Sequence, residues 1–183
     1  ELMKMGEPGV PEMNAYIEEV LKEGETLGFD GRVVSVGEGE DYAAIAGKKN
    51  AKVNYQVDLI DEIWEDRPVL SEEPAFNLDV KYAGETVASK LARIREEMKE
   101  AGTNVHVVST IDDICWTLNI RGNDIDFFPL VLSYGIITMD SFELYIDERK
   151  LDDKLKAKLA KDGVNLHPYN DIYEDVKKFG SDV

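Results

Sequence analysis

The sequence predicts an α/β protein in which helices flank a mixed β-sheet. Three observations lead to this fold class. Apolar residues make up 43% of the 183 residues and aromatic residues 9%, which is enough to build a core. The helical segments repeat apolar residues every third or fourth position, whereas the strand segments are rich in β-branched residues. From residue 86 to residue 179 these segments follow the order α-β-α-β-β-α-β-α, which is typical of helices packed on the faces of a sheet.

The first third of the chain contains short predicted elements. Pro11 suits the first turn of a helix because it has no amide hydrogen to leave unbonded, and Gly24 suits the residue beyond its end. We therefore expect a first helix over residues 11–22. The further expectations are an apolar run at 27–31 closed by Asp-Gly, strand-like residues at 33–36, a helix over 40–49, an alternating strand over 52–56 and a short acidic helix over 59–64.

The least patterned stretch covers residues 68–81, which contain two prolines and several polar residues without helical period. We expect a linker there, between a first region at residues 1–67 and a second at residues 82–180. Residues 2–5, three of which are apolar, run directly into a breaker of glycine and proline, like the end of a strand whose partners are missing. This pattern favours a fragment of a longer protein. Gly180 stands at the usual position of a helix C-cap.

The second region carries the stronger patterns. A long amphipathic helix begins at Thr86 and ends at Gly102, with charged residues opposite its apolar face. Thr110 is expected to cap the next helix, whose first turn contains Asp112 and Asp113. The remaining expected elements are a strand over 105–109, a hairpin of strands over 130–139 and 142–146, a lysine-rich helix over 147–161, a strand over 164–167 and a last helix over 170–179.

The charge balance restricts the partners. The chain has 21 basic and 38 acidic residues, so its net charge is −17. Such a surface repels phosphate backbones and anionic lipids, and we therefore expect neither nucleic acid nor membrane as a partner. No apolar run approaches the roughly 20 residues of a spanning helix. The one cysteine, Cys115, excludes an intramolecular disulfide and a cysteine-ligated zinc site, and with no signal segment in the sequence we expect a cytoplasmic protein.

Groups that could support catalysis or bind a metal form only weak patterns. With 38 acids, close carboxylate pairs are inevitable, and most of them stand where helices begin, so capping explains them better. His106 and His167 lack the spacing of zinc ligands and are interpreted as core or surface histidines, and Cys115 as a small buried hydrophobe. The glycines at 28–31 and 37–39 match no phosphate-binding pattern and are interpreted as turns. The carboxylate pairs are Asp58/Asp61, Asp112/Asp113, Asp124/Asp126 and Asp152/Asp153.

One stretch is less easily explained as scaffold. Residues 116–125 read WTLNIRGNDI: a helix ends, a polar turn follows, and a strand begins a few residues later. Such loops on a rigid scaffold are where binding groups concentrate. Gly122 should allow a sharp turn that aims the Arg121 guanidinium outward. Arg121 then either binds a carboxylate of a ligand or forms a local ion pair with Asp124 or Asp126, and both alternatives stay open.

Several motifs occur together along the chain. They are GFDGRVVS at 28–35, DLIDEIWEDRP at 58–68, YAGE at 82–85, IDDI at 111–114, the 116–125 stretch with FFP at 127–129, SY at 133–134, LYID at 144–147 and PYNDIY at 168–173. In this order, and over nearly the whole chain, they resemble the cytosolic Xaa-Pro aminopeptidases, also called aminopeptidase P, of the three-domain type.

The resemblance implies the fold of a creatinase/prolidase amino-terminal domain, a mixed sheet with helices in ribonuclease H-like layers. Residues 1–67 would be the carboxy-terminal part of a first such domain and residues 82–180 a complete second one. It also implies a parent enzyme that removes the amino-terminal residue before proline. Its divalent metal pair, expected to be manganese, is held by Asp, Asp, His, Glu and Glu in a pita-bread catalytic domain. None of these ligands falls in this chain, so we expect no cofactor in it and no catalysis by it alone.

The resemblance further implies that this region shapes the substrate channel and supports domain or subunit contacts. The Asn-Ile-Arg-Gly turn would place Arg121, together with Asn119 and Tyr134, toward that channel as substrate-binding residues. The expected partners are the catalytic domain of the same parent chain, short Xaa-Pro peptides, and a second copy in a homodimer. The alternatives are a free-standing acidic α/β module that binds a protein partner and a ribonuclease H-like nuclease, against which the negative charge argues.

Overall fold

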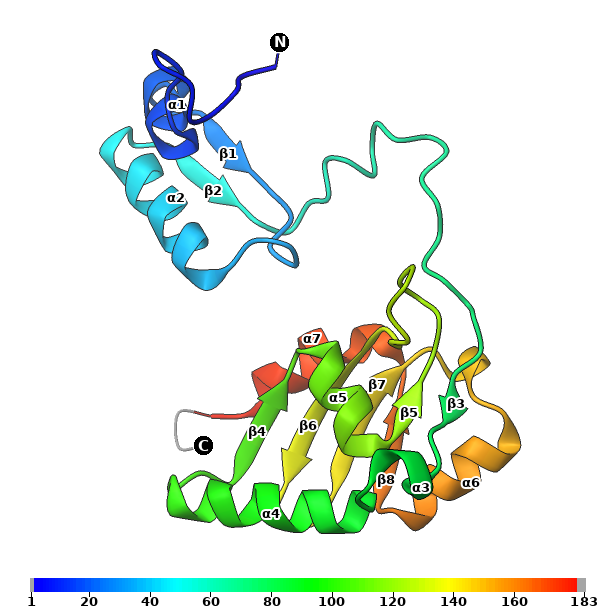
Figure 1. Cartoon of the computed structure of the whole chain (residues 1–183). Coiled ribbons are helices and arrows are strands. Elements are labelled where there is room, and N and C mark those ends of the chain that lie inside the picture. Colours follow the sequence, from blue (N-terminus) through cyan, green and yellow to red (C-terminus); the bar gives the residue numbers. More distant parts are fainter. Residues whose placement is uncertain (1, 181–183) are drawn as a thin grey trace. The chain divides into compact units, whose positions relative to one another are not determined.

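The computed structural model describes residues 2–180. The chain divides into two compact units, with bounds Glu1–Val69 and Leu70–Val183. Figure 1 shows their elements. The first unit is small. Helices α1 (Met13–Val20) and α2 (Val36–Lys48) pack with a parallel pair of strands, β1 (Thr26–Gly28) and β2 (Lys52–Asn54). Its core contains three buried side chains, Leu21, Ile45 and Ala46.

The strand expected at residues 33–36 is wrong: residues 33–34 form a bend, and helix α2 begins at Val36. Ser35 is the N-cap of α2: its hydroxyl accepts the Glu38 amide at 3.3 Å, and the Glu38 carboxylate accepts the Ser35 amide at 3.1 Å. This reciprocal capping box satisfies two amides that the first helical turn leaves unbonded. The Ser-x-x-Glu spacing was present in the sequence and outweighs the β-branched residues beside it.

The short acidic helix expected at residues 59–64 is also wrong, since this segment forms turns. Oδ1 of Asp58 accepts the amides of Ile60 at 3.1 Å and Asp61 at 3.2 Å, and Oδ2 accepts Arg67 at 2.6 Å. A side chain that bonds nearby amides competes with helical hydrogen bonds. The apolar residues of this segment are exposed: Leu59, Ile60, Ile63 and Trp64.

The second unit contains a mixed sheet of four strands in the order β4-β6-β7-β8. They are β4 (Val105–Val108), β6 (Ser133–Thr138), β7 (Phe142–Ile146) and β8 (Val164–His167). The first two pairings are antiparallel and β7 pairs with β8 in parallel. The α/β class, the mixed sheet and the hairpin of β6 and β7 are therefore confirmed.

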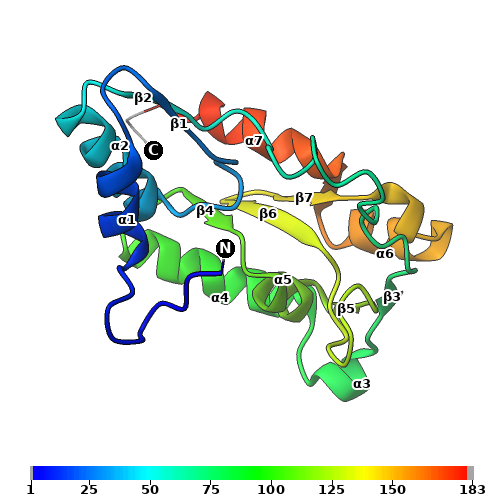
Figure 2. The same cartoon turned by 90° about the horizontal axis from the view of Figure 1, so that it is seen from above.

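Helices cover both faces of this sheet. In Figure 2, α4 (Val87–Glu100) and α5 (Ile111–Leu118) lie on one side of β6 and β7, and α7 (Ile172–Asp175) lies on the other. The main core joins α4, α5 and α6 (Asp153–Lys161) to one face of the sheet. A smaller cluster packs the segment around α7 onto the other face, through Ile136, Tyr145 and Ile172. Alternate residues along β6 and β7 point to opposite faces, so each strand serves both clusters.

Two expected helices are shorter than the sequence pattern indicates. The lysine-rich helix begins at Asp153 and not at 147, because the Asp152 carboxylate caps it by accepting the Leu155 amide at 2.7 Å. Before it lies a single 3-10 turn, Glu148–Lys150. The last helix is divided into the 3-10 turn Tyr169–Asp171, α7, and a second 3-10 turn.

The stretch expected as a linker contributes to the second unit from Ala75 onward. Ala75 is buried in the main core, and β3 (Phe76–Asn77) pairs antiparallel with β5 (Ile120–Arg121). Helix α3 (Val80–Ala83) follows, with the Asp79 side chain as its N-cap. Strands of two residues carry no periodic pattern, so neither β3 nor β5 could be predicted.

Candidate functional site

The predicted site is built around the carboxyl end of α5. Asn119 is the C-cap residue in the left-handed conformation, with φ 52°, and its amide bonds the carbonyls of Cys115 and Trp116. Asparagine is one of the few residues other than glycine that adopts this conformation readily. The chain then turns into β5, which brings Arg121 beside the same helix end.

The Asn119 side chain is 1% exposed and is bonded at both ends. Its Oδ1 accepts Lys90 Nζ at 2.7 Å, and its Nδ2 donates to the Glu85 carbonyl at 2.9 Å. The amide therefore joins α5 to the start of α4. These two hydrogen bonds give the Asn119 side chain a structural role.

Lys90 is a buried residue that the sequence reading placed on the polar face of its helix. Its side chain is 1% exposed, and Nζ donates to the Trp116 carbonyl at 2.6 Å and lies 4.3 Å from the centre of the Trp116 ring. Burial lowers the pKa of Lys90, with the carboxylate of Glu85 opposing that shift. A cation is favourable at the negative end of a helix dipole, which explains why a lysine is tolerated there.

Arg121 also caps this helix end. Its Nη1 donates to the carbonyls of Cys115 and Ile120, both at 2.8 Å. Over residues 2–180, no ion pair joins Arg121 to Asp124 or Asp126, so the expected local salt bridge does not form. Nε and Nη2 of the half-buried guanidinium donate no hydrogen bond within that same range. Nη1 of the Arg121 guanidinium is therefore bonded to the backbone of this chain, whereas Nε and Nη2 could donate to another acceptor.

Asp124 forms a buried ion pair with Lys150 instead. Their Oδ2 and Nζ atoms are 2.5 Å apart, and the side chains are 0% and 2% exposed. The same Oδ2 accepts the Leu132 amide at 2.7 Å, whereas Oδ1 is buried and has no hydrogen-bond partner among residues 2–180. The Lys150 carbonyl in turn accepts the Ala75 amide at 2.9 Å. The pair thus ties three separate segments together. The sequence did not predict this pair, because Lys150 falls in the lysine-rich helix expected over residues 147–161.

Gly122 is needed for close packing. A Cβ at this position would collide with Cγ2 of Val131, across the base of the loop that connects β5 to β6. We expected Gly122 to allow a sharp turn, but its φ angle is not positive. Glycine is needed here because two chain segments approach each other closely.

Tyr134 lies in a different group of side chains, on β6. Its hydroxyl is 3.1 Å from the Tyr173 hydroxyl, and its ring centre is 5.1 Å from that of Tyr169. Burial, and then the hydrogen bond with Tyr134, raise the pKa of Tyr169. The structure brings Asn119 and Arg121 together at the end of α5 and places Tyr134 in this tyrosine group; no hydrogen bond joins Arg121 to Tyr134 in the described part of the chain.

The weak candidates of the sequence have structural roles. Cys115 is 1% exposed, and burial raises the pKa of its thiol, as expected for a buried hydrophobe. His106 is exposed on β4, and His167 Nε2 lies 2.6 Å from a carboxylate oxygen of Glu143. Within residues 2–180, no three His, Cys, Asp or Glu side chains are grouped closely enough to hold a metal ion. These residues do not fit the metal pair that the resemblance implies for the parent.

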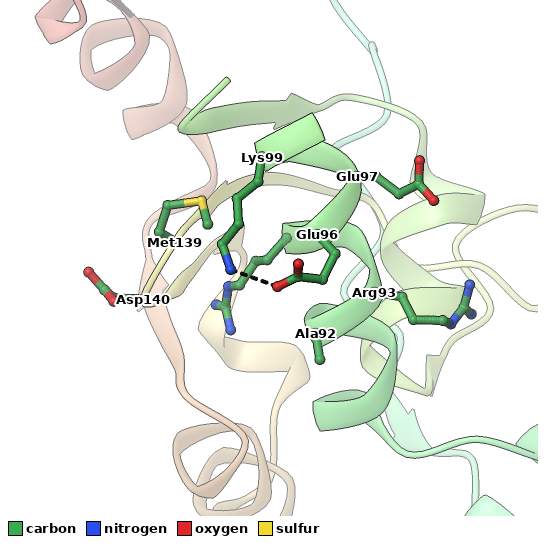
Figure 3. Close-up of a pocket in the computed structure, with 8 residues that line it drawn as sticks. Ala92, Arg93, Glu96, Glu97, Lys99, Met139 and Asp140 are labelled. Carbon is green, nitrogen blue, oxygen red and sulfur yellow. Dashed lines mark hydrogen bonds and ion pairs between the residues drawn. The ribbon is translucent and has the colours of Figure 1, made fainter. Parts of the chain in front are cut away.

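A surface hollow of about 650 Å³ lies beside α4 (Figure 3), and none of the predicted site residues lines it. Its side chains carry both charges, and the ammonium of Lys99 pairs with Glu96 at 2.6 Å. Arg95 is used by the scaffold, since it donates to the carbonyls of Thr138 at 2.8 Å and Ser141 at 3.0 Å. The hollow brings no convergent catalytic groups together.

The fold and the site thus define a mixed α/β domain without a metal centre in its described residues. A family model described as "Creatinase/Prolidase N-terminal domain" matches residues 66–182, and the chain belongs to this family. No helix in the part described is both long and apolar enough to cross a membrane.

The chain is similar to several aminopeptidases. It is 37% identical to "Aminopeptidase P2" of Arabidopsis thaliana over 96% of this chain and 25% of that protein. It is 34% identical to "Xaa-Pro aminopeptidase app-1" of Caenorhabditis elegans over 94% of this chain and 28% of that protein. The crystal structure of X-prolyl aminopeptidase from Caenorhabditis elegans, described as a cytosolic enzyme with a di-nuclear active site, superposes with a TM-score of 0.86 at 33% identity, covering 96% of this chain and 29% of that one. The chain therefore spans a quarter to three tenths of the relatives it matches.

Proposed function

We propose that this chain is a non-catalytic amino-terminal region of a metal-dependent Xaa-Pro aminopeptidase. The observation that carries the proposal is the match of almost the whole chain to about a quarter of such enzymes, at 37% identity in sequence and with a TM-score of 0.86 in structure. The Caenorhabditis elegans relative is described as having a di-nuclear site, and the residues described here do not form one. The metal pair, expected to be manganese, would then belong to the catalytic domain of the parent.

Within that parent, we propose that Arg121 faces the substrate channel. The support is geometric: Nη1 is held by two carbonyls, and Nε and Nη2 remain open among residues 2–180. A planar guanidinium with two free donors fits a carboxylate, such as the carboxyl end of a short peptide. Asn119 and Lys90 hold the helix end that positions Arg121, so their contribution is indirect. The cytoplasm is the compartment that this proposal implies.

The test compares the purified parent with this chain. The parent should release the first residue of an Xaa-Pro peptide, lose that activity with a chelator, and regain it with a divalent metal ion. This chain alone should release nothing and bind no manganese or zinc tightly by calorimetry. A peptide with alanine in place of proline is the control. Cleavage by this chain alone, stopped by chelator, would refute the non-catalytic role.

A further inference from the structure

The loop between β5 and β6 presents aromatic side chains to solvent. We call residues 122–132 the aromatic finger. Its tip is formed by Ile125, Phe127 and Phe128, whose exposed fractions are 37%, 102% and 59%. Single exposed apolar residues are ordinary on protein surfaces, so exposure alone would carry no argument.

The backbone at the tip makes Phe127 unusual. Its φ angle is +68°, in the left-handed region that bulky residues rarely adopt. Glycine or asparagine would occupy this conformation at lower cost, and the fully exposed ring makes no packing contact that offsets the cost. Strained residues of this kind persist where function requires them. The local structure gives no reason for a phenylalanine at this position.

The finger is held firmly at its base. The Asp124 amide donates to the Leu130 carbonyl at 3.2 Å, and the Asp124 carboxylate is held by Lys150 and by the Leu132 amide. Nearer the tip, the Phe128 amide donates to the Ile125 carbonyl at 3.1 Å. A loop whose backbone is held before contact loses less entropy on binding, so the backbone of the finger is organised for an interaction.

We propose that the aromatic finger docks onto the catalytic region of the same parent polypeptide, with Phe127 inserted into an apolar recess there. This rests on the proposed function. The catalytic region is proposed as the partner because about seven tenths of each similar enzyme lies outside the part that this chain matches. The finger also has a hollow of about 280 Å³, lined by residues from Asn123 to Pro129, which include both phenylalanines. This hollow can receive a side chain of the catalytic region.

Photo-crosslinking tests this contact directly. The parent would carry p-benzoyl-phenylalanine in place of Phe127, and a mixture of nitrogen-15-labelled and unlabelled parent would be irradiated and digested for mass spectrometry. The expected product joins the finger to a peptide from beyond residue 183 of the same molecule, without mixed labels. The control carries the same group in place of Tyr82, which is 74% exposed on α3.

Two outcomes would overturn the proposal. Mixed-label products would identify a second copy as the occupant, and crosslinking no greater than at position 82 would leave the finger in solvent. Neither depends on catalysis, so failure of the docking is distinguishable from failure of the proposed function, which the cleavage assay decides.

A substitution gives a second, independent readout. Phe127→Gly removes the strained conformation, so it should raise the Tm of this chain by about 2 to 4 °C. In the parent the same substitution removes the docked ring and should instead lower Tm and speed proteolysis at the finger. The control substitution Tyr82→Ala should shift the Tm of this chain and the Tm of the parent in the same direction. A rise in Tm of both proteins on Phe127→Gly would contradict the docking.

Discussion

The two units differ in how completely each buries its own sheet. In the described residues, the first unit has two parallel strands and a core of three buried residues. The main sheet of the second unit has four strands and is covered on both faces, and its main core has eighteen buried residues. Parallel strands are normally buried on both faces, and a two-stranded sheet is marginal in water. The exposed apolar residues at 59–64 belong to the first unit as well. From this comparison we expect the second unit to be stable by itself and the first unit to be marginally stable by itself.

The largest effect is expected on separating the units. Residues 70–183 should fold alone with a cooperative thermal transition, and residues 1–69 should show none in circular dichroism. A start at residue 82 should lower Tm relative to a start at residue 70, because it removes β3 and Ala75. A cooperative transition in residues 1–69 would contradict the comparison.

The next effect contrasts a buried ion pair with an exposed one. Lys150→Met leaves the buried carboxylate of Asp124 without its cation, which should cost about 3 to 5 kcal/mol of unfolding free energy. Lys48→Met removes an exposed pair with Glu18 in the first unit and should cost about 1 kcal/mol or less. Urea unfolding of the whole chain measures both. Equal losses of unfolding free energy would mean that burial of the Asp124–Lys150 pair does not increase its effect on stability.

The third prediction concerns Arg121 in the full parent. Arg121→Ala should lower kcat/KM for Xaa-Pro peptides by roughly tenfold to a hundredfold, at about 1.4 kcal/mol per decade. Arg121→Lys should recover only part of this, since lysine lacks the planar fork. The matched control is Arg67→Ala in the first unit, which should leave the kinetics unchanged. The bonds of Nη1 to Cys115 and Ile120 also predict a small fall in Tm, and a kinetic loss that follows unfolding alone would return Arg121 to a purely structural role.

The smallest effect concerns single carboxylates. The Arg93 guanidinium, and then the Ser89 hydroxyl, lower the pKa of Glu85 to about 2 from an ordinary value of 4.5. Because the folded pKa is the lower one, the stabilisation is complete above about pH 4.5 and is lost as the pH falls toward 2. Glu85→Gln should therefore be less stable than the unsubstituted chain at pH 7, and the difference should shrink at pH 3. Urea unfolding at both pH values checks this.

The same comparison applies to Asp58 in the first unit. The Arg67 guanidinium lowers the pKa of Asp58, so Asp58→Asn should show the same direction of pH dependence. A difference between Glu85→Gln and the unsubstituted chain that grew on acidification would mean that Arg93 does not stabilise the ionised form of Glu85.

Much of the second unit could be predicted because its elements are long and periodic. The helix from Val87 to Glu100, the strand at Val105 and the hairpin around Asp140 have patterns that local sequence determines. Two predicted elements of the first unit are wrong in type, whereas the errors in the second unit concern helix bounds and the short elements β3 and α3. At residues 33–36 a capping box outweighed β propensity, and at 59–64 the Asp58 side chain captured amides that a helix would use.

The sequence by itself determined the fold class, the family resemblance and Arg121 as a candidate, because periodicity and motif order are properties of neighbouring residues. Only the tertiary structure decided which polar groups are buried. Asn119 contacts Lys90 from 29 positions away, and Asp124 contacts Lys150 from 26 positions away. It also decided that Phe127 is fully exposed in a left-handed conformation. Burial and long-range pairing depend on how separate segments pack together, and no local pattern encodes them.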